Sequence, residues 1–234
     1  MSTLSVRCMT NGPLPRVAAI LAQYREVADE IICIANARFT DAELAVLRPY
    51  ADRVVRAQMR PGFSIGHYRA WERKLSSDCD WVLVIDHDEV PSRDLLDNLP
   101  GIMAVPHVAA YQITKRWSFP DAGHWLDEDP WAPNWSSALI RNDPNMWHFD
   151  SALHVGTIPP HPLRQVDLPT YHLACLVESA AARVAKVKSY RDHTGADPAA
   201  ELDGTELMYL PEQAAALAPA TTPARDLEII NRVL

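Results

Sequence analysis

Three carboxylates lie within four positions in residues 86–89, which read Asp-His-Asp-Glu. They follow the run Trp-Val-Leu-Val-Ile, the strongest strand pattern in the chain, so we expect them where a buried strand ends. Carboxylates two positions apart can converge on one cation, and hard divalent ions combine such ligands with phosphate oxygens. A bound cation would also relieve the repulsion among the acids. The alternative is that they cap a helix beginning near Ser92, because negative charge is favourable there.

The first ninety residues predict the elements that position this acidic segment. Short apolar runs alternate with helical patterns, one of which begins at Thr40 with Glu43 three residues later, as in a capping box. This alternation predicts an α/β fold with a parallel sheet and helices on both faces, in which ligands bind at the carboxyl ends of the strands. The predicted strands are residues 4–9, 30–35, 53–56 and 80–86, with a further helix at 68–75.

The pattern changes after residue 89, and the second half of the sheet is expected to be mixed. We predict a single domain over residues 1–234 that ends in a helical tail. The predicted helix in this part has Val177, Ala181, Val184 and Lys188 along one stripe. The expected elements are strands at 108–119, 136–141 and 168–173, a helix at 177–191, a linker at 214–223 and a short docking helix at 225–234.

Composition limits the classes of function. The net charge of −8 and the lack of a basic patch argue against a nucleic-acid partner. The N-terminus has no signal-peptide pattern, and no apolar run approaches the ~20 residues of a transmembrane segment. The four cysteines show no Cys-x-x-Cys spacing and are expected to be reduced. These features favour a cytoplasmic protein, and a peripheral place at the inner membrane face is compatible with them.

Residues 80–89 resemble the DWVLxLDADE stretch of family 2 glycosyltransferases with the GT-A fold. The order of several later residues is similar to that in bacterial lipopolysaccharide-core-type members, and the resemblance covers roughly residues 3–192. The matching segments are Ser5-Val-Arg-Cys-Met-Thr-Asn11, Asp29-Glu-Ile-Ile-Cys-Ile34, Thr40-Asp41, Asp52-Arg-Val-Val55, Ile140-Arg141, His154, Tyr171-His172 and Lys188-x-Tyr190.

The resemblance implies a GT-A-like, Rossmann-like fold and a hexosyltransferase-type enzyme. Such an enzyme moves a sugar from a nucleotide-sugar donor to a hydroxyl of a small-molecule, glycan or glycolipid acceptor. It implies that residues 1–90 bind the nucleotide sugar, that residues 91–175 bind the acceptor, and that residues 176–234 form the tail.

A divalent cation, Mn²⁺ or Mg²⁺, is part of what the resemblance implies. It makes Asp88 the leading ligand and lets Asp86 contact the ribose, or the metal through water. His172 or His154 would complete the site. The nucleotide site is assigned to Thr10, Asn11, Asn36 and Asp86. Two residues depart from the family pattern. Asn36 replaces the usual aspartate, which leaves the preference for a nucleotide base open. His87 replaces a small residue, and it either is a further metal ligand or points away from the metal.

The loop between residues 117 and 135 is rich in tryptophan, proline and acids. Indole rings can stack on the apolar faces of sugars, so the loop is a candidate lid over the site. The other reading is a loop held down by its own aromatic residues. Family members generally invert the anomeric centre, which needs a base for the acceptor proton. Asp127, Glu128 and Asp129 are the candidate catalytic residues, with Asp150 as a weaker rival.

Two other functions fit part of the pattern. Residues 86–90 also match the D-x-D-x-[TV] signature of haloacid-dehalogenase-like phosphohydrolases, whose first aspartate is the nucleophile. That signature normally follows the first strand, however, and here it follows the fourth. A non-catalytic nucleotide- or sugar-binding protein of the same fold is the third reading, because a fold alone does not establish function.

Overall fold

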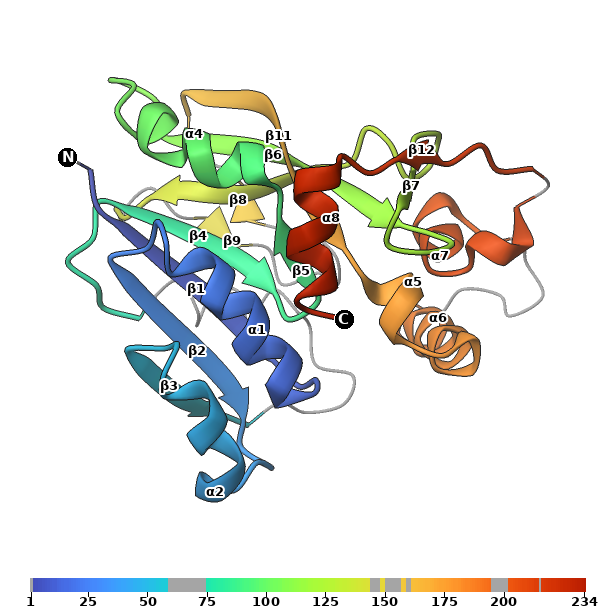
Figure 1. The fold of residues 1–234 in the computed structure, drawn as a ribbon, viewed down its shortest axis with the longest axis horizontal. Helices are drawn as coiled ribbons and strands as arrows, with labels where there is room; N and C mark the ends of the chain where they lie inside the picture. Colours follow the sequence, from blue (N-terminus) through green and yellow to red (C-terminus); the bar gives the residue numbers. More distant parts are fainter. Residues whose placement is uncertain are drawn as a thin grey trace.

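The computed structural model describes residues 2–58, 75–143, 148–149, 157–158, 161–194, 202–214 and 216–234. Ten strands form one sheet, and two further short strands form a separate pair (Figure 1). The sheet strands are β1 (Leu4–Thr10), β2 (Glu30–Asn36), β3 (Arg53–Ala57), β4 (Trp81–Asp86), β5 (Glu89–Pro91), β6 (Ala110–Ser118), β7 (His124–Leu126), β8 (Trp135–Arg141), β11 (Leu163–His172) and β12 (Ala220–Thr221), and the pair is β9 (His148–Phe149) and β10 (Thr157–Ile158).

Helices lie between the strands and in the C-terminal part of the chain. The helix α2 begins with a capping box in which the Thr40 hydroxyl accepts from the Glu43 backbone, as the sequence predicts. The helices are α1 (Leu14–Tyr24), α2 (Asp41–Leu44), α4 (Arg93–Met103), α5 (Ala174–Val177), α6 (Ala180–Thr194), α7 (Gly204–Tyr209) and α8 (Ala224–Asn231), with 3₁₀ turns η1 (Ala45–Leu47) and η3 (Pro211–Gln213).

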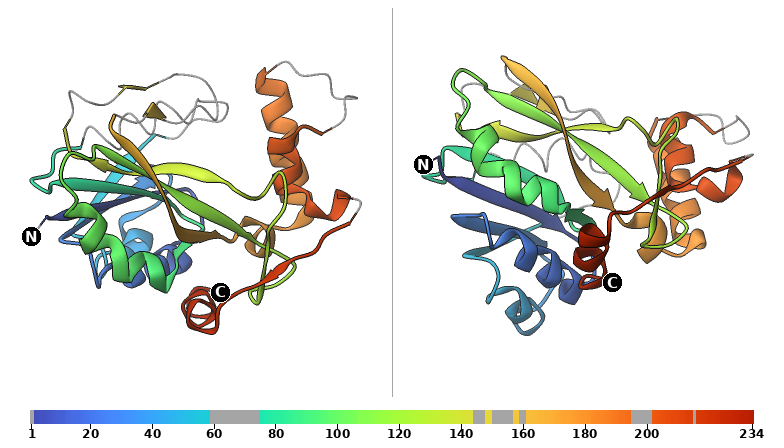
Figure 2. Two further views of the ribbon diagram at one scale, coloured as in Figure 1. Left: turned by 90° about the horizontal axis from the view of Figure 1, so that it is seen from above. Right: turned by 45° about the horizontal axis from the view of Figure 1, so that its top comes forward.

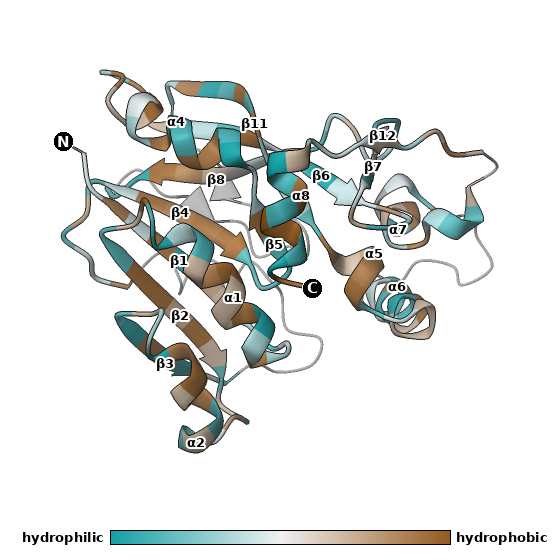
Figure 3. Ribbon diagram, viewed as in Figure 1, coloured by the Kyte–Doolittle hydropathy of each residue, from teal (hydrophilic) through white to brown (hydrophobic). Residues whose placement is uncertain are grey.

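The N-terminal half of the sheet is parallel. Strands β3, β2, β1 and β4 lie side by side in that order, and all their pairings are parallel. Cys8 on β1 lies between Cys33 on β2 and Ile85 on β4. Strands β1, β2 and β4 are hydrophobic along most of their length (Figure 3) because both faces of the sheet are buried there, whereas β3 carries Arg53 and Arg56 and is only partly buried. The four strands predicted from sequence are therefore confirmed.

The second half of the sheet is mixed, as predicted. Strand β8 runs antiparallel to both β4 and β6, which makes β6 parallel to β4. Strand β11 pairs parallel with β6 and antiparallel with β5. The carboxyl ends of β1, β2, β4, β6 and β11 therefore face the same edge of the sheet. Together the two halves form an α/β fold whose N-terminal half is a parallel sheet.

One face of the sheet is covered by α1, α4 and α8 (Figure 2). Leu4, Val6 and Cys8 of β1 pack against these helices in the main core. On the opposite face, Ile32 and Ile34 pack with Leu75. The helix predicted at 68–75 falls almost wholly outside the described residues.

The C-terminal part returns to the sheet. Strand β12 pairs with β7, and α8 contacts β5 and α4. The predicted docking helix is confirmed, since Ile229, Ile230 and Val233 belong to the main core. No helix in the described ranges is long and apolar enough to cross a membrane.

The prediction of which residues form the buried face of the helix at 177–191 is wrong. Val184 is 49% exposed, whereas Arg183, Val187 and Arg191 are buried. The buried face of the helix contains two arginines because acidic residues of the following segment pair with them. Arg191 pairs with Glu206, and Arg183 pairs with Glu212.

Candidate active site at the carboxyl edge of the sheet

The acidic segment lies at the carboxyl edge, as predicted. Strand β4 ends at Asp86, a turn carries His87 and Asp88, and β5 begins at Glu89. Because β5 pairs with β11, Glu89 stands opposite His172. The topology thus brings together acids from one part of the chain and a histidine more than eighty residues away.

Capping does not explain the acidic segment. Helix α4 is capped by Ser92, whose hydroxyl accepts a hydrogen bond from the Leu95 backbone at 3.0 Å. The acid in its first turn is Asp94 rather than a member of the segment. The three carboxylates therefore have another role.

Glu89 holds the turn together. Its side chain is buried and forms an ion pair with Lys115 of β6, and its Oε2 accepts a hydrogen bond from the Asp86 backbone at 3.0 Å. The Lys115 ammonium also lies 3.8 Å from Asp86 Oδ2. Lys115 thus compensates most of the charge of Glu89 and part of that of Asp86. Sequence reasoning missed this lysine because only the strand pairing brings β6 to the acids.

Asp88 is the least compensated acid of the segment. It is 3% exposed, and within the described part of the chain its carboxylate accepts no hydrogen bond. Its nearest partner is His172, which is also buried, with Nε2 3.7 Å from Asp88 Oδ2. Burial raises the pKa of the Asp88 carboxyl, but at acidic pH the protonated form of His172 opposes that effect, and the pKa lies below its usual value.

His172 is held as a neutral ring. Burial lowers its pKa below the ordinary value, and the attraction of Asp88 does not offset this. Its ring stacks on Trp117 with centroids 4.0 Å apart, and its Nδ1 has no hydrogen-bond partner among the described residues. A neutral imidazole and an uncompensated carboxylate are the donor types that a divalent cation takes.

These donors fit a divalent cation in part. No group of three or more His, Cys, Asp or Glu side chains within the described ranges is arranged to hold an ion. Asp88 and His172 are nevertheless oriented toward each other, and the Asp86 side chain is 28% exposed. A cation here would take its remaining ligands from the phosphate oxygens of a substrate, as Mg²⁺ commonly does. His154, the other predicted ligand, lies outside the described residues.

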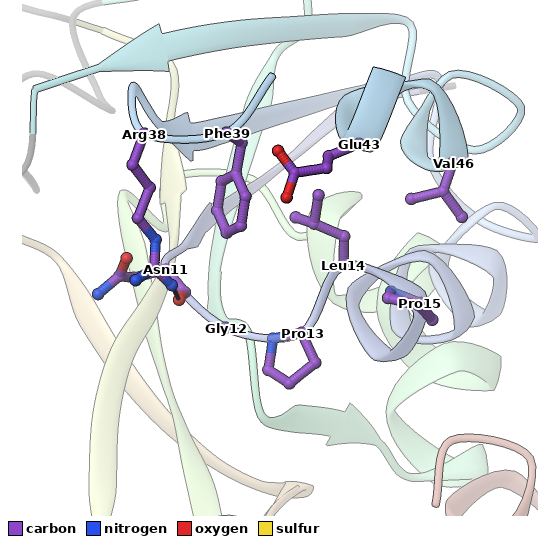
Figure 4. Close-up of a pocket in the computed structure, with 9 residues that line it drawn as sticks. All are labelled: Asn11, Gly12, Pro13, Leu14, Pro15, Arg38, Phe39, Glu43 and Val46. Carbon is purple, nitrogen blue, oxygen red and sulfur yellow. Dashed lines mark hydrogen bonds between the residues drawn. The ribbon is translucent and has the colours of Figure 1, made fainter. Parts of the chain in front are cut away.

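A cavity of about 530 Å³ opens beside the acidic turn, between the loops that follow β1 and β2 (Figure 4). Asn11 is part of its wall, whereas Thr10 and Asn36 are buried next to it. Sequence reasoning missed Arg38 and Phe39, which the loop after β2 brings to the cavity. Its lining residues are Asn11, Gly12, Pro13, Leu14, Pro15, Arg38, Phe39, Glu43 and Val46.

Hydrogen bonds fix the wall of this cavity. Asn36 Nδ2 donates to Asn11 Oδ1 at 2.9 Å, and Asn36 Oδ1 accepts from the Arg38 backbone at 3.0 Å. The Arg38 guanidinium donates to the Asn11 carbonyl at 2.6 Å and lies 4.9 Å from the centroid of the Phe39 ring. Both polar groups of the Asn36 amide therefore take part in hydrogen bonds that join the two loops. Arg38 and Phe39 place a cation and an aromatic ring in the wall of the cavity.

Gly12 connects the cavity to the acidic turn. A Cβ atom at this position would lie 2.4 Å from His87 Cδ2, closer than side chains approach one another. The His87 ring therefore packs directly on the loop after β1, and only glycine leaves room for it. The cavity and the acidic segment share this contact.

The tryptophan-rich loop is anchored by its own aromatic residues. Trp117 and Trp131 are buried in one cluster, and Trp131 Nε1 donates to the Met208 carbonyl at 3.2 Å. Glu128 Oε1 accepts from the Ala218 backbone at 3.2 Å, whereas Asp127 and Asp129 are exposed. The predicted roles of these three acids stay predictions. Asp150 lies outside the described residues.

No protein-family model and no curated protein sequence matches the chain. Among solved structures, it is similar to S. aureus TarS, with 13% identity and a TM-score of 0.49 over 89% of this chain and 70% of that one. It is also similar to glucosyl-3-phosphoglycerate synthase from Mycobacterium tuberculosis in complex with Mn²⁺, uridine diphosphate and phosphoglyceric acid. The identity is 13% and the TM-score 0.49 over 98% and 91% of the two chains. At these values, neither likeness specifies a substrate or the role of a residue.

Proposed function

We propose that the chain is a metal-dependent, inverting glycosyltransferase of the hexosyltransferase type with a GT-A-like fold. The observation that supports this most directly is the buried Asp88 carboxylate, which faces His172 at the carboxyl edge without a hydrogen bond. A buried, uncompensated carboxylate is costly unless a cation pairs with it. The resemblance of residues 80–89 to the family 2 motif points to the same use.

The proposed reaction forms one bond and breaks another at the anomeric carbon. The acceptor hydroxyl oxygen attacks that carbon from the face opposite the nucleotide, and the carbon–oxygen bond to the β-phosphate breaks with its electron pair left on the phosphate. The acceptor proton passes to a carboxylate base, for which we propose the group Asp127, Glu128 and Asp129. Mn²⁺ or Mg²⁺ held by Asp88, His172 and Asp86 would stabilise the charge on the departing diphosphate.

The cavity beside the turn suits the nucleotide. Its Phe39 ring offers a face on which a base can stack, and Arg38 offers donors to a base or a ribose. Gly12 in the wall of this cavity contacts His87, the chain neighbour of Asp88, and we propose that the phosphates of a nucleotide bound there extend toward Asp88. We propose a nucleotide-sugar donor and a small-molecule, glycan or glycolipid acceptor, used in the cytoplasm of a bacterium or at the inner face of its membrane.

Thermal unfolding with nucleoside diphosphates tests this function. UDP, GDP, ADP and CDP would each be added with and without Mn²⁺ to the wild type, to Asp88→Asn and to the control Asp192→Asn, whose side chain is exposed on α6. We expect at least one nucleotide with Mn²⁺ to stabilise the wild type and the control by ~2.7 kcal/mol at about one hundred times its Kd.

Asp88→Asn should lose the Mn²⁺-dependent part of this stabilisation, because the amide carries no charge to hold the cation. If no nucleotide stabilises the wild type with Mn²⁺, the proposed function is wrong. If Asp88→Asn responds to Mn²⁺ as the wild type does, the function stands and the metal assignment is wrong.

A further inference from the structure

The helices α6 and α7 form a wall beside the acidic turn that the proposed mechanism has not yet used. Lys186 and Tyr190 lie four positions apart on α6 and so share one face of that helix. Their partner on α7 is Tyr209, whose ring centroid lies 4.4 Å from the Lys186 ammonium and 5.8 Å from the Tyr190 ring centroid. One cation is thus fixed on a small aromatic platform.

A continuous series of contacts leads from this platform to Asp88. The Tyr209 ring meets the Trp117 ring edge-on at 5.2 Å, and Trp117 stacks on His172 at 4.0 Å. His172 in turn lies 3.7 Å from Asp88. Lys186 therefore stands on the same wall as the proposed metal ligand, separated from it by a row of packed rings.

Ion pairs fix α6 on both sides of Lys186, and the pair of Arg191 with Glu206 is buried. Arg191 donates two hydrogen bonds to the Glu206 carboxylate, at 2.7 and 2.8 Å, and the side chains of both residues are 9% exposed. Arg183 pairs with Glu212 and donates to the Cys175 carbonyl at 3.2 Å. The position of Lys186 therefore does not depend on a bound ligand.

The Lys186 side chain is charged and partly exposed. Burial lowers its pKa, but the acidic surroundings of Tyr190, Asp88, Glu178 and Asp86 outweigh this and raise it. Its one ion-pair partner among the described residues is Glu178, whose Oε1 is 3.7 Å away, and 29% of the Lys186 side chain is exposed. The other lysine close to the acids, Lys115, is ion-paired with Glu89.

We propose that Lys186 binds the diphosphate of the nucleotide from the same wall as Asp88, and thereby neutralises the oxygen that leaves the anomeric carbon. This inference rests on the proposed function and assigns a residue within the same site. A diphosphate next to Asp88 gains negative charge as the sugar departs, and a fixed ammonium stabilises that charge without a proton transfer. Lysine is a common point-charge ligand for phosphate.

The chain supplies a matched control on the same helix. Lys188 is exposed and faces away from the buried stripe, so Lys188→Met changes the net charge as Lys186→Met does but leaves the platform intact. Isothermal titration would give the Kd of Mn²⁺–pyrophosphate, of Mn²⁺–UDP and Mn²⁺–GDP, and of the nucleosides uridine and guanosine. Pyrophosphate reports on the anion site without any base.

We expect Lys186→Met to weaken binding of pyrophosphate and of the bound nucleoside diphosphate by about 10- to 100-fold, the range for a hydrogen bond to a charged group. Binding of the nucleoside should be unchanged, and Lys188→Met should bind all ligands as the wild type does. Lys186→Arg should recover part of the loss, since it restores the charge. Near-ultraviolet circular dichroism of each variant would show that the fold is retained, and Lys186→Gln serves as the second variant should methionine disturb it.

Three results would overturn the inference. They are an unchanged Kd for pyrophosphate in Lys186→Met, an equal loss in Lys188→Met, and a loss of nucleoside binding as large as that of the diphosphate. The two proposals can fail separately. Wild-type binding of pyrophosphate that depends on Lys186, without binding of any nucleoside diphosphate, would support the anion site and contradict the glycosyltransferase.

Discussion

The three acids of the segment 86–89 have three different environments, although they are neighbours in the chain. Glu89 is neutralised by Lys115 and holds the Asp86 backbone. Asp86 is partly exposed and lies 3.8 Å from the Lys115 ammonium, and Asp88 is buried without a hydrogen bond in the described structure. Charge that is locally compensated stabilises a turn, whereas charge that is not compensated is available to a ligand. This difference singles out Asp88 as the functional carboxylate.

The contact between Gly12 and His87 can be tested by a double-mutant cycle. Gly12→Ala places a methyl group where the His87 ring lies, so we expect it to lower the midpoint of thermal unfolding and to weaken binding of nucleoside diphosphate. In the background His87→Ala the same methyl group has room, so Gly12→Ala should lower the unfolding midpoint and weaken binding much less there. Equal effects of Gly12→Ala in both backgrounds would show that the ring does not fill this space.

At the scale of elements, α6 and the segment that follows it are joined by two ion pairs, of which the one between Arg191 and Glu206 is buried. Arg183 and Arg191 of α6 form ion pairs with the following segment. Helix α7 begins with a capping box that contains Glu206, the residue that pairs with Arg191. Removing one partner of a buried pair leaves the other uncompensated and typically costs 3–5 kcal/mol. The wall that carries Lys186 therefore depends on the ionisation of carboxylates.

This dependence predicts a specific effect of pH on stability. The hydrogen bonds from Arg191 lower the pKa of Glu206, so the pair contributes its full stability above the unfolded-state pKa of about 4.3 and loses it as the pH falls through the lower folded-state pKa. The difference in unfolding midpoint between the wild type and Glu206→Gln should thus be largest near pH 6 and narrow below about pH 4. The control Glu228→Gln, at an exposed position on α8, should show no such narrowing.

Sequence patterns predicted those elements whose signals are local. The short strand patterns of β1 to β4, the capping box at Thr40 and the docking helix α8 need only neighbouring residues to be recognised. The placement of Asp86 and Asp88 at the carboxyl edge followed from the same alternation of strands and helices. Asn11, which the sequence also placed at this edge, lines the cavity next to it.

Residues that depend on contacts distant in the sequence could not be predicted. Lys115 meets Glu89 only because β11 pairs with both β5 and β6. The stripe expected on α6 was wrong because hydrophobicity alone cannot show that the buried arginines Arg183 and Arg191 form ion pairs with carboxylates of the following segment. Lys186 carries no local signal either, since its aromatic platform is assembled from α6, α7 and β6.

At the scale of the molecule, the C-terminal helix completes the core of the N-terminal half. Ile230 of α8 is fully buried among residues of β1, α1 and α4. Next to it, Asp226 accepts hydrogen bonds from the Tyr171 hydroxyl at 2.8 Å and from the Arg93 backbone at 2.7 Å. The tail thereby fixes α4 and β11, and β11 carries His172.

Truncating one side chain of α8 measures this contribution. Ile230→Ala should lower the free energy of unfolding by about 2–5 kcal/mol, because it leaves a cavity in the main core. Leu234→Ala, at a position that is 55% exposed, should change it by less than ~0.5 kcal/mol. Equilibrium unfolding in urea would give both values. A loss below ~1 kcal/mol for Ile230→Ala would mean that α8 contributes little to the core.

The hydrogen bond between Tyr171 and Asp226 can form only late in the synthesis of the chain. The two residues are 55 positions apart, so at 5–20 residues per second a ribosome reaches Asp226 about 3–11 s after Tyr171. During that interval a nascent chain can pair β5 with β11, while the helix that covers them has not been made. Apolar surface of the main core is then open to chaperones, and the site becomes complete only when translation has delivered α8.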